Sequence, residues 1–196
     1  MDSADFILAS ASARRRDLLM QIGARFVCCP MNVDESPLPS EGPGDYVTRL
    51  ALSKASAAYS ARDGAVQGLP AMGSDTTVVI DDQILGKPTS GEEAVAMLLS
   101  LAGRSHRVMT AVALVDDRQQ AVRLSSTTVS FCPISRDRAL EYWQTGEPAD
   151  KAGGYGIQGR GAVFVEKIEG SYSGVVGLPL AETRELLELF DIPYWQ

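Results

Sequence analysis

The sequence predicts a mixed α/β fold in which a twisted sheet is flanked by helices. Short apolar runs bounded by polar and turn-forming residues predict buried strands. Longer stretches with apolar residues three and four positions apart predict helices. The two patterns alternate along 196 residues, of which 45% are apolar and 22% are charged. A chain of this composition and length can bury a substantial core.

The first half of the chain opens with a strand, a loop and a helix. Residues 6–9 form a short apolar run, and Leu18, Leu19 and Ile22 share one face of the helix that ends at Gly23. The further elements expected before residue 90 are a strand at 26–29, a loop at 32–44, an alanine-rich helix at 46–61, a strand at 69–80 and a return strand at 84–85.

The second half continues the alternation without an internal repeat, a linker or a low-complexity tract. The expected elements are a helix at 92–101, strands at 107–115 and 121–131 joined as a hairpin, a helix at 136–143, a glycine-rich loop at 146–161, a strand at 162–168, a turn-rich segment at 169–179 and an amphipathic helix at 180–190. This order predicts one continuous domain over residues 1–196, with two lobes around a cleft as a variant.

Charge and composition limit the classes of partner. The formal net charge is -7, which disfavours nonspecific binding to nucleic acid or to an anionic membrane surface. The acidic N-terminus lacks the basic region of a secretory signal, and no apolar stretch is long enough to span a bilayer. We therefore expect a cytoplasmic protein. Cys28, Cys29 and Cys132 have no zinc-binding spacing, and we expect them to be reduced and mostly buried.

A small-residue loop with basic residues joins the first strand to the first helix. Backbone N–H groups at the helix start, the hydroxyls of Ser10 and Ser12, and the guanidinium groups of Arg14 and Arg15 suit a polyphosphate. The alternative is a helix cap by Ser12 followed by solvated arginines. Cations in the first turn of a helix are disfavoured by the helix dipole, which favours the interpretation with an anionic partner.

Acidic residues supply a second group of candidates. Asp75 lies within an apolar segment, where an ionised carboxylate is costly unless it is paired, hydrogen-bonded or bound to metal. An Asx turn with Thr77 is the structural alternative. Asp34 and Glu35 follow the second strand and, by local pattern alone, are typical of a solvated surface. His106 is the only histidine, and since no nucleophile motif lies near it, we expect a surface or hydrogen-bonding structural role.

Two lysines and a glycine-rich segment complete the candidates. Lys54 lies in the alanine-rich helix, where a solvated cation is usual, whereas Lys87 follows a strand end, where α/β folds collect ligand groups. The dense glycines of residues 150–159 allow either a close approach to a flat ligand or positive φ angles, with a flexible surface loop as the alternative. Within that segment, the amide of Gln158 can bind the edge of a nucleobase.

Together these blocks resemble the Maf family of nucleoside triphosphate pyrophosphatases over essentially the whole chain. In chain order the matching blocks are Ser-x-Ser-x-Arg-Arg at 10–15, Asp-Glu at 34–35, Lys54, Gly-Ser-Asp-Thr at 73–76, Gly-Lys-Pro at 86–88, the segment 150–159 and Val-Val-Gly-Leu-Pro at 175–179. The resemblance implies an elongated, two-lobed fold with a central cleft, similar to that of inosine triphosphate pyrophosphatases. It also implies hydrolysis of a nucleoside triphosphate to the monophosphate and pyrophosphate with a divalent cation, Mg²⁺ or Mn²⁺.

The resemblance assigns roles to individual positions. The proton acceptor of the family falls at Asp75, and the family positions that sort its members by base fall at Arg14, Thr76 and Gln158. The residues found here are those of the subgroup that hydrolyses dTTP and UTP. Modified pyrimidine triphosphates are further candidate substrates.

Hydrolysis at the α-phosphorus needs an oriented water, a carboxylate that accepts its proton and cations that offset the charge of the leaving group. On this basis we assign Glu35 as a ligand of the metal or of a metal-bound water. We assign Arg15, Lys54 and Lys87 as phosphate contacts.

Two other functions are compatible with the same residues. One is a purine-type house-cleaning pyrophosphatase for inosine or xanthosine triphosphate, which would use the same phosphate contacts with a different base pocket. The other is a nucleotide-binding regulator of cell division that does not hydrolyse its ligand, an association that the family has with septum formation. A homodimer is a candidate assembly for any of the three.

Overall fold

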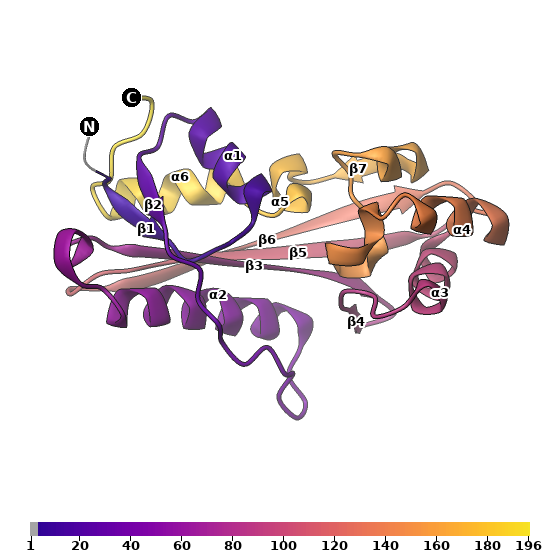
Figure 1. The fold of residues 1–196 in the computed structure, drawn as a ribbon, viewed down its shortest axis with the longest axis horizontal. Helices are drawn as coiled ribbons and strands as arrows, with labels where there is room; N and C mark the ends of the chain where they lie inside the picture. The colour runs from indigo at the N-terminus through magenta and orange to yellow at the C-terminus, as the bar shows by residue number, and fades with distance from the viewer. Residues whose placement is uncertain (1–3) are drawn as a thin grey trace. The chain divides into compact units, whose positions relative to one another are not determined.

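The computed structural model describes residues 4–196 and has a mixed α/β fold, as the sequence predicts (Figure 1). Its strands form a seven-stranded sheet in the order β2-β1-β3-β5-β6-β7, with β4 paired to β3. The strands are β1 (Phe6–Leu8), β2 (Phe26–Cys28), β3 (Ala71–Ile80), β4 (Gln83–Leu85), β5 (Ser105–Val115), β6 (Gln120–Phe131) and β7 (Val165–Glu169). Parallel pairs β1–β2 and β1–β3 and antiparallel pairs β3–β4 and β6–β7 make the sheet mixed.

Helices account for the other regular elements of the described residues. The α-helices are α1 (Ala13–Gln21), α2 (Pro43–Ser60), α3 (Gly91–Leu101), α4 (Arg136–Gln144), α5 (Tyr172–Val176) and α6 (Leu180–Leu189). Short 3₁₀ helices are η1 (Gly64–Val66), η2 (Glu147–Asp150), η3 (Ala152–Gly154) and η4 (Arg160–Phe164). No helix among residues 4–196 has both the length and the apolar character that a membrane span requires.

The chain divides into two compact units. The first comprises Met1–Asp75, Thr110–Ser125 and Gly177–Gln196, and the second comprises Thr76–Met109 and Ser126–Val176. The strands β3, β5 and β6 each contribute residues to both units. This division agrees with the two lobes that the family resemblance implies. The central cleft and the single domain over residues 1–196 stay predictions.

In the first unit, α2 lies on one side of the strands, and α1 and α6 lie on the other (Figure 1). The helix α2 begins after Gly42 with Pro43 in its first turn, a position that suits the fixed φ of proline. Its buried residues recur at helical spacing, which makes one face of α2 part of the core: they are Val47, Leu50, Ala51, Lys54, Ala55 and Ala58. Lys54 therefore lies on the buried face of the helix, which the local sequence pattern does not indicate.

Gly73 allows the backbone of α2 to lie close to β3. A Cβ atom at Gly73 would overlap the carbonyl oxygen of Ala51 and would lie 2.6 Å from the amide nitrogen of Ala55. Both neighbours are backbone atoms, which cannot give way without moving the helix. Lys54 lies between those two alanines in α2, and Asp75 is two residues after Gly73 in β3, so this close approach brings the two charged residues near each other.

We expect Gly73→Ala to destabilise the protein by roughly 1–3 kcal/mol, the usual cost of overpacking a well-packed core. The free energy of unfolding from urea denaturation measures the effect. The matched control is Gly68→Ala, because no atom of residues 4–196 lies within 4 Å of a Cβ built at Gly68. That control should change stability by less than about 0.5 kcal/mol, and a Gly73→Ala protein as stable as the control would contradict the close approach.

The second unit has its own core, in which α3 packs against α4 and aromatic rings meet edge to face. His106 is buried there, and its Nε2 lies 2.8 Å from the hydroxyl oxygen of Tyr155. Burial lowers the pKa of His106 to about 4, so the ring is neutral at pH 7. Of the two roles expected for this histidine, the surface position is wrong because the side chain is buried, and the hydrogen-bonded position is confirmed.

The structure differs from the predicted elements mainly after residue 145. Residues 162–164 belong to η4 and not to the strand, because the amide of Ala162 bonds to the carbonyl of Gly159 and continues a tight turn. The short helix α5 lies in the segment expected to be only turn-rich, and it begins where Ser171 accepts a hydrogen bond from the amide of Gly174.

The prediction of mostly buried cysteines is wrong. Cys28 and Cys29 are exposed, and Cys132 is only half-buried. Cys28 ends β2, which is an edge strand of the sheet, so no further strand among residues 4–196 covers its outer flank. The apolar run at 26–29 indicates the strand but not its place at the edge.

Candidate active site

The N-terminus of α1 is organised by two serines. The Oγ of Ser12 caps the helix by accepting the amide of Arg15 at 3.4 Å, as the alternative interpretation expected. The Oγ of Ser10 accepts the amide of Ser12 at 3.2 Å and Nη1 of Arg15 at 3.2 Å. Arg14 and Arg15 are both half-buried. Arg15 is thus a fixed cation at the start of a helix and not a solvated side chain.

The carbonyl oxygen of Gly177 connects this loop to β3. Nε of Arg15 donates to that oxygen at 2.8 Å, and Oγ of Ser74 donates to it at 3.2 Å. Arg15 and the residue before Asp75 therefore share one acceptor. Burial lowers the pKa of Arg15, and the negative charge of Asp75 opposes this shift, so the two charges lie within electrostatic reach of each other. An arginine remains protonated in such a site.

Lys54 holds two carboxylates at once. Its Nζ lies 2.6 Å from Oδ1 of Asp75 and 2.6 Å from Oε1 of Glu35. Lys54 is 9% exposed and Asp75 is 8% exposed, whereas the side chain of Glu35 is 50% exposed. Asp75 thus accepts a hydrogen bond from Lys54, which replaces the Asx turn with Thr77 as the explanation of its burial.

The pKa of Asp75 lies above its usual range. Burial is the main cause, and the charge and hydrogen bond of Lys54 oppose it, as does the charge of Arg15. A raised pKa makes the carboxylate a better proton acceptor than an exposed aspartate, provided that it is ionised at the working pH. The position and the electrostatics of Asp75 suit a general base.

The loop that carries Glu35 is held by two residues of α2 that the sequence pattern did not indicate. The hydroxyl of Tyr46 donates to the carbonyl of Glu35 at 2.9 Å, and Nη2 of Arg49 donates to the carbonyl of Ser36 at 3.0 Å. Arg49 also binds both carboxylate oxygens of Glu41, which lowers the pKa of Glu41 to about 2. These contacts attach the loop that carries Glu35 to α2.

A helical spacing could have indicated part of this attachment. Tyr46 and Lys54 are eight residues apart, which places them on the same face of α2. The sequence alone gives no sign of which loop that face would meet.

The remaining predicted residues belong to the second unit. Thr76 follows Asp75 directly in β3 and is half-buried, Lys87 is exposed just after β4, and Gln158 is exposed in a turn. The amide of Gly153 donates to the carbonyl of Gly86 at 2.9 Å, which brings the segment of Lys87 beside the glycine-rich segment that carries Gln158.

The carboxylates of Glu35 and Asp75 could together hold a divalent cation. One oxygen of each binds the ammonium group of Lys54 at 2.6 Å, so the two carboxylates lie beside each other around that nitrogen. Within residues 4–196, no group of three or more His, Cys, Asp or Glu residues is arranged to hold a metal by itself. One or two carboxylates completed by substrate phosphates and water are a usual site for Mg²⁺, so Glu35 and Asp75 would supply oxygen ligands of the type that this ion prefers.

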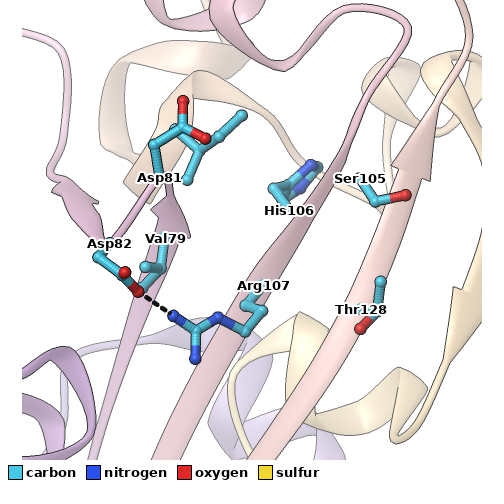
Figure 2. Close-up of a pocket in the computed structure, with 8 residues that line it drawn as sticks. Val79, Asp81, Asp82, Ser105, His106, Arg107 and Thr128 are labelled. Carbon is cyan, nitrogen blue, oxygen red and sulfur yellow. Dashed lines mark hydrogen bonds and ion pairs between the residues drawn. The ribbon is translucent and has the colours of Figure 1, made fainter.

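A pocket of about 330 Å³ in the second unit is lined by other residues than the predicted site residues. Figure 2 shows Arg107 paired with Asp82 on this pocket. Nη2 of Arg107 lies 2.7 Å from Oδ1 of Asp82, and His106 and Ser105 also line the pocket. Its exposed acidic residues are engaged within the fold, since Asp81 also pairs with Arg104. The pocket therefore gives no reason to relocate the candidate site.

Comparison with known proteins places this sequence in a family. The family model described as Maf-like protein matches residues 5–190. A dTTP/UTP pyrophosphatase of Saccharophagus degradans is 54% identical over 195 residues, which cover 100% of this chain and 93% of that protein. The proteins of the same name from Alkalilimnicola ehrlichii and Alcanivorax borkumensis are 53% and 52% identical, over 95% and 96% of this chain and 93% and 97% of theirs. The chain therefore belongs to the Maf-like protein family.

Proposed function

We propose that this protein is a nucleoside triphosphate pyrophosphatase that hydrolyses dTTP and UTP to the nucleoside monophosphate and pyrophosphate. The names of relatives that are 52–54% identical over nearly the whole chain support this activity. The observation that carries the mechanism is the buried Asp75 carboxylate, held 2.6 Å from Lys54 and within the field of Arg15.

The proposed reaction is attack of a water oxygen on the α-phosphorus. The bond between that phosphorus and the oxygen bridging to the β-phosphorus breaks, and pyrophosphate leaves. Asp75 accepts the proton of the attacking water. Lys54 keeps Asp75 ionised, and the guanidinium of Arg15 with the hydroxyl of Ser10 offsets charge on the phosphates. Lys87 and the helix cap at Ser12 add further phosphate contacts.

The metal in this proposal is Mg²⁺ or Mn²⁺, with Glu35 as its principal protein ligand and Asp75 beside it. When bound, such an ion offsets negative charge on the phosphate oxygens. Tyr46 and Arg49 support this role, because they fix the loop that carries Glu35.

In this proposal, Arg14, Thr76 and Gln158 distinguish the nucleobase of the substrate. The Gln158 amide can donate to a carbonyl of thymine or uracil and accept from N3–H, whereas cytosine presents mismatched partners. Loss of one such pair, once the bound nucleobase covers it, costs about 1–3 kcal/mol. A cytoplasmic location and a homodimer stay predictions.

The test is a panel of nucleoside triphosphates with Mg²⁺ or Mn²⁺, in which pyrophosphate and orthophosphate release are both measured. It tests the reaction class and the nucleobase preference together. We expect pyrophosphate release with the highest kcat/KM for dTTP and UTP. Preferred hydrolysis of inosine or xanthosine triphosphate would replace this proposal by the purine-type function. Tight nucleotide binding without turnover at saturating Mg²⁺ would replace it by the regulator.

A further inference from the structure

The turn that presents Gln158 is held at both ends by two side chains from outside it. The amide of Gly159 bonds to the carbonyl of Gly156 at 3.3 Å, so Gln158 occupies a central position of the turn 156–159. Gln158 itself is exposed, whereas Gly156 at the start of the turn is buried. The backbone position from which the Gln158 side chain projects is therefore set by what binds the ends of the turn.

The two side chains are Tyr142 at the end of α4 and Glu147 at the start of η2. The hydroxyl of Tyr142 accepts the amide of Gly156 at 3.0 Å and donates to Oε1 of Glu147 at 2.7 Å. The Glu147 carboxylate also accepts the amide of Arg160 at 2.8 Å and that of Gly161 at 3.0 Å. One carboxylate and one hydroxyl thus bind the backbone on each side of the turn.

The glycines of this segment serve those contacts. A Cβ at Gly159 would overlap both carboxylate oxygens of Glu147, and a Cβ at Gly161 would overlap the hydroxyl of Tyr142. Burial opposes ionisation of Glu147, but its hydrogen bonds outweigh burial and hold its pKa below the usual value. The carboxylate is therefore ionised at neutral pH and accepts all three donors.

We propose that Glu147 and Tyr142 are positioning residues for base specificity, because they hold the turn 156–159 in the conformation that presents the Gln158 amide to the nucleobase. This inference rests on the proposed function. Neither side chain needs to touch the substrate. A hydrogen-bonding site that is misplaced loses discrimination between bases more than it loses the phosphate chemistry.

The test uses Glu147→Gln and Tyr142→Phe in the full-length chain, with dTTP, UTP and CTP as substrates. In Glu147→Gln one carboxylate oxygen becomes an NH₂ group that faces a backbone donor, and in Tyr142→Phe the shared hydroxyl is lost. We expect the ratio of kcat/KM for dTTP to that for CTP to fall by about tenfold or more, with KM for dTTP raised and kcat within about threefold of the parent. The milder Tyr142→Phe keeps the test valid if Glu147→Gln does not fold.

Two comparisons separate positioning from a general loss of stability. The control is Glu141→Gln in α4, the helix that carries Tyr142. It changes an exposed carboxylate that pairs with the exposed Arg138, and it should leave the ratio unchanged. In a Gln158→Ala background, Glu147→Gln should change the ratio by less than about threefold, because the group it positions is gone.

The outcomes distinguish this inference from the proposed function. A parent enzyme that releases no pyrophosphate from dTTP or UTP overturns the proposed function, and the specificity role with it. Suppose instead that the parent releases pyrophosphate from dTTP or UTP, and that the folded variants have the same ratio of kcat/KM for dTTP to that for CTP as the parent. That result overturns only the positioning role. An equal fall of the ratio in the Gln158→Ala background would also overturn it, since the two side chains would then act on something other than Gln158.

Discussion

Replacing Asp75 by asparagine should lower kcat for dTTP hydrolysis by about 10²–10⁴-fold, the usual contribution of a positioned general base. Asparagine has nearly the same shape and can still accept a hydrogen bond from Lys54, which lies 2.6 Å from Oδ1 in the parent. It cannot accept the proton of the attacking water. The loss should therefore appear in kcat, measured as pyrophosphate release at saturating dTTP.

Binding and stability separate this effect from a structural one. We expect Asp75→Asn to bind dTTP, measured by calorimetry, with a Kd within about tenfold of the parent, because the substitution removes a negative charge beside the phosphates and leaves Arg15 in place. Asp63→Asn is the matched control, since Asp63 is exposed and its side chain does not cap η1. A folded Asp75→Asn enzyme that releases pyrophosphate at the parent rate would remove Asp75 as the base.

The sequence could predict most of the secondary structure because apolar periodicity is a local property. The expected strand at 69–80 is β3 (Ala71–Ile80), and the expected helix at 46–61 is α2 (Pro43–Ser60). The return strand after Asp81 and Asp82 also agrees, since both residues adopt the positive φ angles of a tight hairpin turn. The strand expected at 162–168 begins only at Val165, because the amide of Ala162 bonds to the carbonyl of Gly159 and is not available for strand pairing. The apolar periodicity of the sequence does not indicate this hydrogen bond.

The candidate site could be predicted as a set of residue types but not as a set of contacts. Asp75 was identifiable because a carboxylate in an apolar run needs a partner, yet the partner is 21 positions away in α2. Lys54 was expected to be solvated because the pattern of an alanine-rich helix does not indicate which of its faces is buried. Likewise, Glu147 carries no local signal, since its three donors come from Tyr142 and from amides 13 and 14 positions later.

Replacing Lys54 by methionine should lower kcat/KM for dTTP by about 10²-fold or more near pH 6 and by less at alkaline pH. Lys54 lowers the pKa of Asp75 by its charge and its hydrogen bond, while burial and the charge of Glu35 raise it. Without Lys54 the pKa of Asp75 rises further. An acid with a raised pKa is ionised at higher pH only, so the acidic limb of the pH profile of kcat/KM should move to higher pH. The profile from about pH 5 to about pH 9.5 measures this shift.

In Lys54→Met, the stability relative to the parent should fall as pH rises, whereas kcat/KM relative to the parent should recover. In Lys54→Met the folded-state pKa of Asp75 exceeds the unfolded value, so the protonated, folded form is favoured at low pH, and stability relative to the parent is lost as pH rises through the folded-state pKa. The melting temperature at about pH 5 and about pH 8 measures this loss. Lys54→Arg is the matched control, because a guanidinium keeps a positive charge beside Asp75 and should leave the acidic limb near that of the parent. An acidic limb in Lys54→Met that coincides with the parent's would show that Lys54 does not set the ionisation of the catalytic carboxylate, and the pair with Asp75 would then be structural only.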